Sequence, residues 1–189
     1  FVWSQLLFKE IEWKTIFLIL SKPIKRYEFI LWKFVWLSLV ISLIVFLQSV
    51  LYLWVLFFKW IEITPLIIFS LIFILLKLIT LISIVLFLST FMSTILTIIV
   101  SMMIYFLSHS FSLLLDLVLK TQNELAVLSA RALQLFFPPF EALNTKDYIW
   151  SLVKIDFVYF LSNFAYSIVY ISLLIIFSVL IFNKKSFER

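Results

Sequence analysis

The chain has 189 residues, of which 65% are hydrophobic and only 13% are charged. Soluble globular domains are roughly 45–50% apolar and 25% charged, so this composition indicates an integral membrane protein. It excludes a soluble enzyme and a nucleic-acid-binding domain, and the net charge of +5 becomes a signal of topology. Because cysteine is absent and His109 is the only histidine, we predict neither a disulfide nor a metal site.

Four stretches stay apolar for the roughly 20 residues that a membrane-spanning helix needs. They are residues 34–58, 64–88, 92–115 and 157–182. Residues 1–8 are apolar but short, and are typical of the end of a truncated upstream span. The predicted fold class is therefore all-α, a polytopic transmembrane helical bundle that forms a single domain over residues 1–189. The second and third spans leave room only for a tight hairpin at Ser89-Thr90.

Two polar segments separate these stretches. The pattern of residues 9–33 predicts two amphipathic helices on the membrane surface, broken at Pro23. Residues 116–156 predict an amphipathic helix that Pro138-Pro139 stops, followed by a loop. Residues 9–33 and the C-terminal tail contain nine of the 15 Lys and Arg residues, so the positive-inside rule makes both cytoplasmic. The remaining segment is then external, in a multi-pass protein of the plasma (inner) membrane.

When the third span and the last span are drawn as helices with 100° of rotation per residue, the polar side chains of each span fall on one face. In the first span Ser38, Ser42, Ser49 and Tyr52 also fall on one side of the helix. Two interpretations stay open: such residues hold helices together, or they line a substrate route. Lys77 lies mid-span, where a charge costs at least about 2.5–3.5 kcal/mol, and it either contacts substrate or packs inward. The residues predicted to face a pathway or a dimer partner are Lys77, Thr94, Thr97, Ser101, Tyr105, Tyr159, Asn163 and Tyr166.

Motifs of catalysis are missing from the sequence. There is no Gly-rich phosphate loop, no G-x-S-x-G and no H-E-x-x-H. His109 and Asp116 share one helical face, but without a second His or any Cys they make an incomplete metal site. We therefore predict no catalytic, cofactor-binding or metal-binding residue, and no enzymatic activity for the chain itself.

The run of residues 12–34 resembles the ABC type-2 permease family. That family carries a Glu-rich stretch and then a Leu-Ser-Lys/Tyr-Pro pattern with Arg, Glu and Lys-Phe just before a span. The positions that match are Leu20, Ser21, Lys22, Pro23, Ile24, Arg26, Glu28, Lys33 and Phe34. Residues 88–96 and 135–147 look familial as well, so the resemblance covers nearly the whole chain.

The resemblance implies a permease subunit of an ABC transporter, an exporter with six spans, that works as a homo- or heterodimer. A separate ATP-binding cassette ATPase would bind the ATP and Mg²⁺, and this chain would bind no cofactor. On that comparison the first span and most of the second are missing upstream. Residues 9–33 would be the cytoplasmic segment that couples to the ATPase, through Glu10, Glu12, Lys22, Pro23, Arg26 and Glu28. The alternative interpretations are an interfacial anchor for this segment and a non-transporting membrane scaffold for the chain.

Glycine is absent, whereas seven tryptophans are present. The family has glycine where this chain has Trp32. One hypothesis is that UGA codons which encode glycine in the source organism were translated here as tryptophan. The other is a genuine belt of tryptophans at the membrane interfaces.

Overall fold

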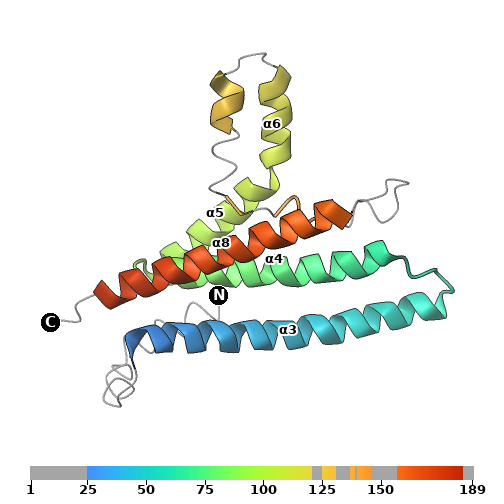
Figure 1. The fold of residues 1–189 in the computed structure, drawn as a ribbon, viewed down its shortest axis with the longest axis horizontal. Coiled ribbons are helices and arrows are strands. Elements are labelled where there is room, and N and C mark those ends of the chain that lie inside the picture. The colour runs from blue at the N-terminus through green and yellow to red at the C-terminus, as the bar shows by residue number, and fades with distance from the viewer. Residues whose placement is uncertain (1–24, 121–124, 131–136, 139, 146–156, 185–189) are drawn as a thin grey trace.

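The computed structural model describes residues 25–120, 125–130, 137–138, 140–145 and 157–184. The described part is helical, without strands, and confirms the all-α fold class. The helices, labelled in Figure 1, are α3 (Arg26–Phe58), α4 (Pro65–Ser89), α5 (Thr94–His109), α6 (Phe111–Lys120) and α8 (Phe157–Lys184). A further helical turn covers residues 125–130.

Helix α4 is the centre of the bundle. It begins with Pro65, whose ring suits a first helical turn, and it packs against α3, α5 and α8. Apolar residues lie on all sides of α4, which is typical of a helix that is buried in a core or spans a membrane. Three helices of the described chain, α3, α4 and α8, are long and apolar enough to cross a membrane, and α5 is a shorter apolar helix.

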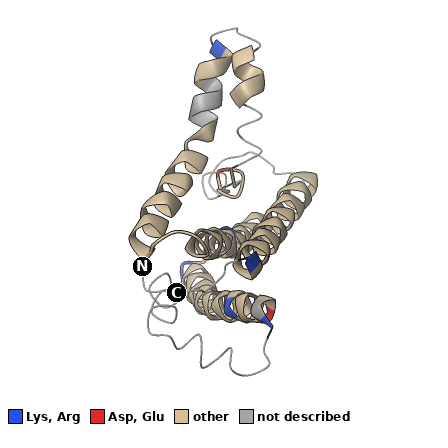
Figure 2. Ribbon diagram, turned by 90° about the vertical axis from the view of Figure 1, so that its left-hand side faces the viewer, with Lys and Arg blue, Asp and Glu red and all other residues tan. Residues whose placement is uncertain are grey.

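One end of the bundle brings together the start of α3 and the ends of α4 and α8. Ile30, Leu86 and Phe182 form a buried cluster there, and the Phe29 and Phe182 rings stack with centroids 6.0 Å apart. Figure 2 views the molecule from this end, where Lys25 at the start of α3 and Lys184 at the end of α8 are both exposed. The described parts of the two basic segments therefore lie at the same end of the bundle.

Helix α3 starts eight residues before the span expected from the sequence. In its first turn the Glu28 carboxylate accepts a hydrogen bond from the Lys25 backbone N–H at 3.3 Å, which is one half of a capping box. The helix of 33 residues is about 50 Å long, whereas the hydrocarbon core is about 30 Å thick. Residues 26–33 are therefore the first two turns of a continuous helix and not a separate surface helix.

The apolar stretch 92–115 is divided between two helices. Helix α5 ends at His109, and Ser110 takes a non-helical conformation before α6 begins at Phe111. Ser and His are weaker helix formers than the leucines around them, which makes this dipeptide a natural place for a break. In Figure 1, α6 projects away from the bundle.

The end of α3 has a conformation that usually requires glycine. Trp60 has φ of 55°, in the left-handed region, and its side chain is 92% exposed. The Ile61 N–H donates to the Leu56 carbonyl and the Trp60 N–H donates to the Phe57 carbonyl, each at 3.1 Å. These two bonds make a Schellman motif, whose left-handed position is most often glycine. The geometry supports the hypothesis that glycine is the natural residue at position 60.

The belt hypothesis fits two other positions. Trp36 and Trp54 lie five helical turns apart on one face of α3, about 27 Å along the axis, and both are more than half exposed. That spacing is close to the thickness of the hydrocarbon core. The tryptophans of α3 therefore need more than one explanation.

We expect Trp60→Gly to raise the free energy of unfolding by about 1 kcal/mol, because it removes the steric cost of a left-handed side chain. Trp54→Gly is the matched control within the same helix. It is expected to lower the stability by about 0.5–1 kcal/mol, because glycine weakens a helix interior. Thermal unfolding in detergent checks both, and equal effects of the same sign would contradict the glycine assignment.

Candidate functional site

A short segment between α6 and α8 packs into the side of the bundle. We call residues 137–138 and 140–145 the inserted segment. Phe140 is fully buried, and Leu143 and Thr145 are 2% exposed. Leu143 packs with Phe73 of α4 and Ile171 of α8. The sequence predicts this stretch as part of an external loop, but its described residues lie against the helices.

Phe140 marks how far the segment reaches along α4. Its ring lies 5.9 Å from the Nζ atom of Lys77, which is the thirteenth of the 25 residues of α4. The ring centroids of Tyr105 and Phe140 are 5.4 Å apart, and Lys77 Nζ is 5.3 Å from the centroid of Tyr105. The Lys77 ammonium therefore lies near two aromatic rings halfway along the central helix, an arrangement that stabilises a cation.

Hydrogen bonds fix the segment to α4 and α8. The Ser70 hydroxyl lies 2.8 Å from the Thr145 hydroxyl and also donates to the Leu66 carbonyl at 2.8 Å. Since Ser70 has one hydroxyl proton, Thr145 is the donor in the bond between them. From α8, the Tyr159 hydroxyl donates to the Ala142 carbonyl at 3.0 Å. The inserted segment is thus attached by hydrogen bonds to both neighbouring helices.

Thr145→Val removes the donor of the Ser70 bond with little change of shape. We expect it to lower the free energy of unfolding by about 1 kcal/mol. A double-mutant cycle with Ser70→Ala should give a coupling energy of about 0.6–1.7 kcal/mol, the range of hydrogen bonds between membrane helices. Thermal unfolding in detergent measures all four proteins. Additive effects would show that the two hydroxyls do not interact.

The structure places the predicted pathway residues in different surroundings. Lys77 and Tyr105 meet, and Tyr159 contacts the inserted segment. Thr97 is fully buried, and its hydroxyl has no hydrogen-bond partner among the described residues. The remaining members of the set are Thr94, which is half-buried; Ser101, which donates to the Ile98 carbonyl; Asn163, which donates to the Tyr159 carbonyl; and Tyr166, whose ring lies 6.4 Å from that of Tyr170.

Most hydroxyls in the long helices satisfy themselves on the preceding turn. Ser42, Thr80 and Ser178, for example, each donate to the carbonyl four residues earlier, at 2.7–2.8 Å. This is the local bonding that the helix-packing interpretation expects of Ser and Thr in a membrane. It means that a polar stripe on these helices is not by itself a water-filled route.

Only the end of the predicted coupling set falls within the described residues. Arg26 is the first residue of α3, and Glu28 caps the same turn. Glu10, Glu12, Lys22 and Pro23 lie outside the described residues. The roles of all six stay predictions.

The sequence analysis missed the inserted segment and a pocket between α3 and α4. A signal for the segment was present, since residues 135–140 form an apolar run inside an otherwise polar stretch. The pocket has a volume of about 230 Å³ and is lined by Val45, Gln48, Ser49, Tyr52, Ile67, Ser70, Leu71 and Ile74. Only Ser49 and Tyr52 of this set were singled out from the sequence. In the described part of the chain no three His, Asp or Glu residues lie close enough to share a metal ion.

Nearly the whole chain matches a known protein family. A family model described as ABC-2 family transporter protein matches residues 4–187. The chain belongs to this family. The resemblance inferred from residues 12–34 is thereby confirmed, and the chain is a membrane permease of an ABC transporter. No curated protein and no solved structure matches the permease.

Membership of this family indicates the kind of protein to which the described helices belong. Permeases of this family are transport components, typically without catalysis of their own. The central helix, the inserted segment and Lys77 are therefore features of a transport protein. The predominantly apolar α4 and the long α3 and α8 agree with its place in a membrane.

Proposed function

We propose that this permease is the transmembrane subunit of an exporter, driven by ATP that a separate ATP-binding cassette subunit hydrolyses. The ATPase docks at the end of the bundle where α3 begins and α8 ends, and this end faces the cytoplasm. ATP and Mg²⁺ are bound by the ATPase, and two permease subunits, identical or different, work together. The inner membrane of a bacterium is the proposed location.

The observation that carries the proposal is the continuity of α3. It runs unbroken from Arg26 to Phe58, so a push on its first turns moves the part of the helix inside the membrane. The cluster of Ile30, Leu86 and Phe182 joins that end of α3 to α4 and α8. A movement at the docking end is therefore passed to three helices at once, which is what coupling to an external ATPase requires.

The charge at the docking end supports the same orientation. Lys25 and Lys184 are exposed there, and basic residues next to membrane helices are a mark of the cytoplasmic side. The scaffold alternative would need neither a cassette partner nor a route for substrate. Membership of a transporter family favours the permease over the scaffold.

Co-purification of the full-length permease with its cassette ATPase, followed by ATPase measurements in vesicles, tests the proposal. We expect the double variant Arg26→Ala with Glu28→Ala to lose at least about tenfold of the coupled activity. Glu28→Gln separates capping from coupling, because glutamine keeps the capping hydrogen bond without the charge. If the double variant retains full ATPase activity and transport, the docking site is wrong. If no ATPase co-purifies with the unaltered protein, the transport function itself is wrong.

A further inference from the structure

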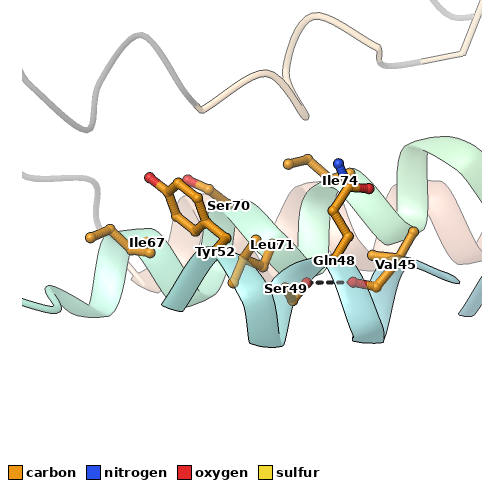
Figure 3. Close-up of a pocket in the computed structure, with 8 residues that line it drawn as sticks. All are labelled: Val45, Gln48, Ser49, Tyr52, Ile67, Ser70, Leu71 and Ile74. Carbon is orange, nitrogen blue, oxygen red and sulfur yellow. Dashed lines mark hydrogen bonds between the residues drawn. The ribbon is translucent and has the colours of Figure 1, made fainter. Parts of the chain in front are cut away.

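The pocket between α3 and α4 has the composition of a site for an uncharged amphiphile. Its walls are mainly aliphatic, and none of its lining residues is charged. Polar groups come from Gln48, Ser49 and Tyr52 on α3 and from Ser70 on α4. Figure 3 shows the Gln48 and Tyr52 side chains rising from α3 on the side where Ser70 and Ile74 project from α4.

Two of these polar groups are available to a ligand. The hydroxyls of Ser49 and Ser70 already donate to carbonyls of their own helices. In contrast, among the described residues neither the amide of Gln48 nor the hydroxyl of Tyr52 has a hydrogen bond, and both residues are exposed. Gln48 lies ten residues before the end of α3, well within the span. An unsatisfied amide in hydrocarbon costs several kcal/mol, so a bound carbonyl or hydroxyl group would relieve a real cost.

The size and opening of the pocket point to part of a membrane molecule. Its volume of about 230 Å³ is below the range of about 300–1,000 Å³ that is typical of sites for drug-sized ligands. Tyr52 and Ile74 at its rim are 39% and 44% exposed, so the pocket opens toward the surroundings of the helices. In a membrane those surroundings are lipid, and a chain can enter while the rest of the molecule stays in the bilayer.

We propose that this pocket binds one apolar chain of an uncharged lipid-like amphiphile, whose carbonyl or hydroxyl group hydrogen-bonds to Gln48 and Tyr52. Ser70 links the site to the inserted segment, because the same hydroxyl lines the pocket and accepts the bond from Thr145. A ligand in the pocket therefore affects the hydrogen bond that holds the inserted segment, which lies beside Lys77. This proposal depends on the proposed function in one respect only, namely that the chain is a permease within a membrane.

Photolabelling tests the site. The full-length permease in phospholipid vesicles is exposed to a diacylglycerol that carries a diazirine in one acyl chain, and labelled peptides are mapped by mass spectrometry. We expect label on residues 45–52 and 67–74. Gln48→Leu should reduce it about fivefold, the effect of one hydrogen bond lost, while Gln48→Asn should restore part of it. Ile74→Trp, which fills the rim, should abolish it.

The matched control is Ile68→Trp, on the same helix and 48% exposed but outside the pocket lining. It should leave labelling unchanged. Label that falls evenly around α3, or that is insensitive to Gln48→Leu, overturns the proposal, as does a cross-link from the pocket to a second protein segment. If ATP and the cassette partner remove the label, the amphiphile is cargo; if the label stays, it is a resident lipid. Both of these results support the site, and neither depends on ATPase docking at α3.

Discussion

Phe140→Ala is expected to lower the free energy of unfolding by about 3–5 kcal/mol, the usual cost of removing a buried aromatic ring. Phe140 is fully buried, and its cluster contains Ile84 and Leu88 of α4. The ring holds the inserted segment against the central helix, so its loss leaves a cavity where α4, α5 and α8 meet. Thermal unfolding in detergent measures the effect.

Phe106→Ala is the control for this variant. Phe106 belongs to α5 and is 62% exposed, so its truncation should change the stability by less than about 0.5 kcal/mol. Equal effects of the two substitutions would mean that the inserted segment is not seated in the bundle as described. Limited proteolysis adds a second measurement, because a released segment in Phe140→Ala would be cut faster than in Phe106→Ala.

Lys77→Met separates a functional lysine from a structural one. Removing the charge from mid-span relieves an insertion cost of about 2.5–3.5 kcal/mol, whereas the contacts with the Tyr105 and Phe140 rings are worth about 0.5–2 kcal/mol. The folded protein should therefore be as stable as before or more stable. If Lys77 serves transport, ATPase activity coupled to the cassette partner should nevertheless fall at least about tenfold.

Lys77→Arg keeps the charge and should retain more activity than Lys77→Met. Lys59→Met, at the exposed end of α3, is the control for loss of a lysine and should leave both stability and activity unchanged. Full activity in Lys77→Met would assign the lysine to packing alone. Stability and coupled ATPase activity, measured on the same preparations, distinguish the two outcomes.

The long helices could be predicted because hydropathy alone defines them. The stretch 64–88 differs by one residue at each end from α4, which has apolar residues on all sides and a proline at its start. The break at Ser110 could not be predicted in the same way, since hydropathy averages over a whole window and two poor helix formers hardly change it. The early start of α3 depends on a cap made by Glu28, a local signal hidden within a charged stretch.

The candidate site was only partly predictable. Lys77 was recognisable because a charge in a span is costly, and Tyr105 because it belongs to a polar stripe. Their shared neighbour Phe140 comes from a distant segment, and nothing in one sequence reveals that pairing. The stripe on α8 does not by itself distinguish a route from helix packing, because Asn163 and its neighbouring serines bond to their own helix. Backbone bonding of this kind is decided by rotamers, which the residue pattern does not encode.

The attachment of the inserted segment has a consequence for synthesis. Ser70 and Thr145 are 75 residues apart in the chain, which a ribosome working at about 5–20 residues per second translates in about 4–15 s. During that interval the face of α4 that Leu143 will cover can rest in lipid, which is as apolar as the side chains. The charge of Lys77 is not sheltered by lipid in this way, and of the two rings beside it Tyr105 is translated before Phe140. The nascent chain therefore holds a charged residue halfway along α4 before both of its aromatic neighbours are present, so we expect insertion of α4 to depend on the insertion machinery.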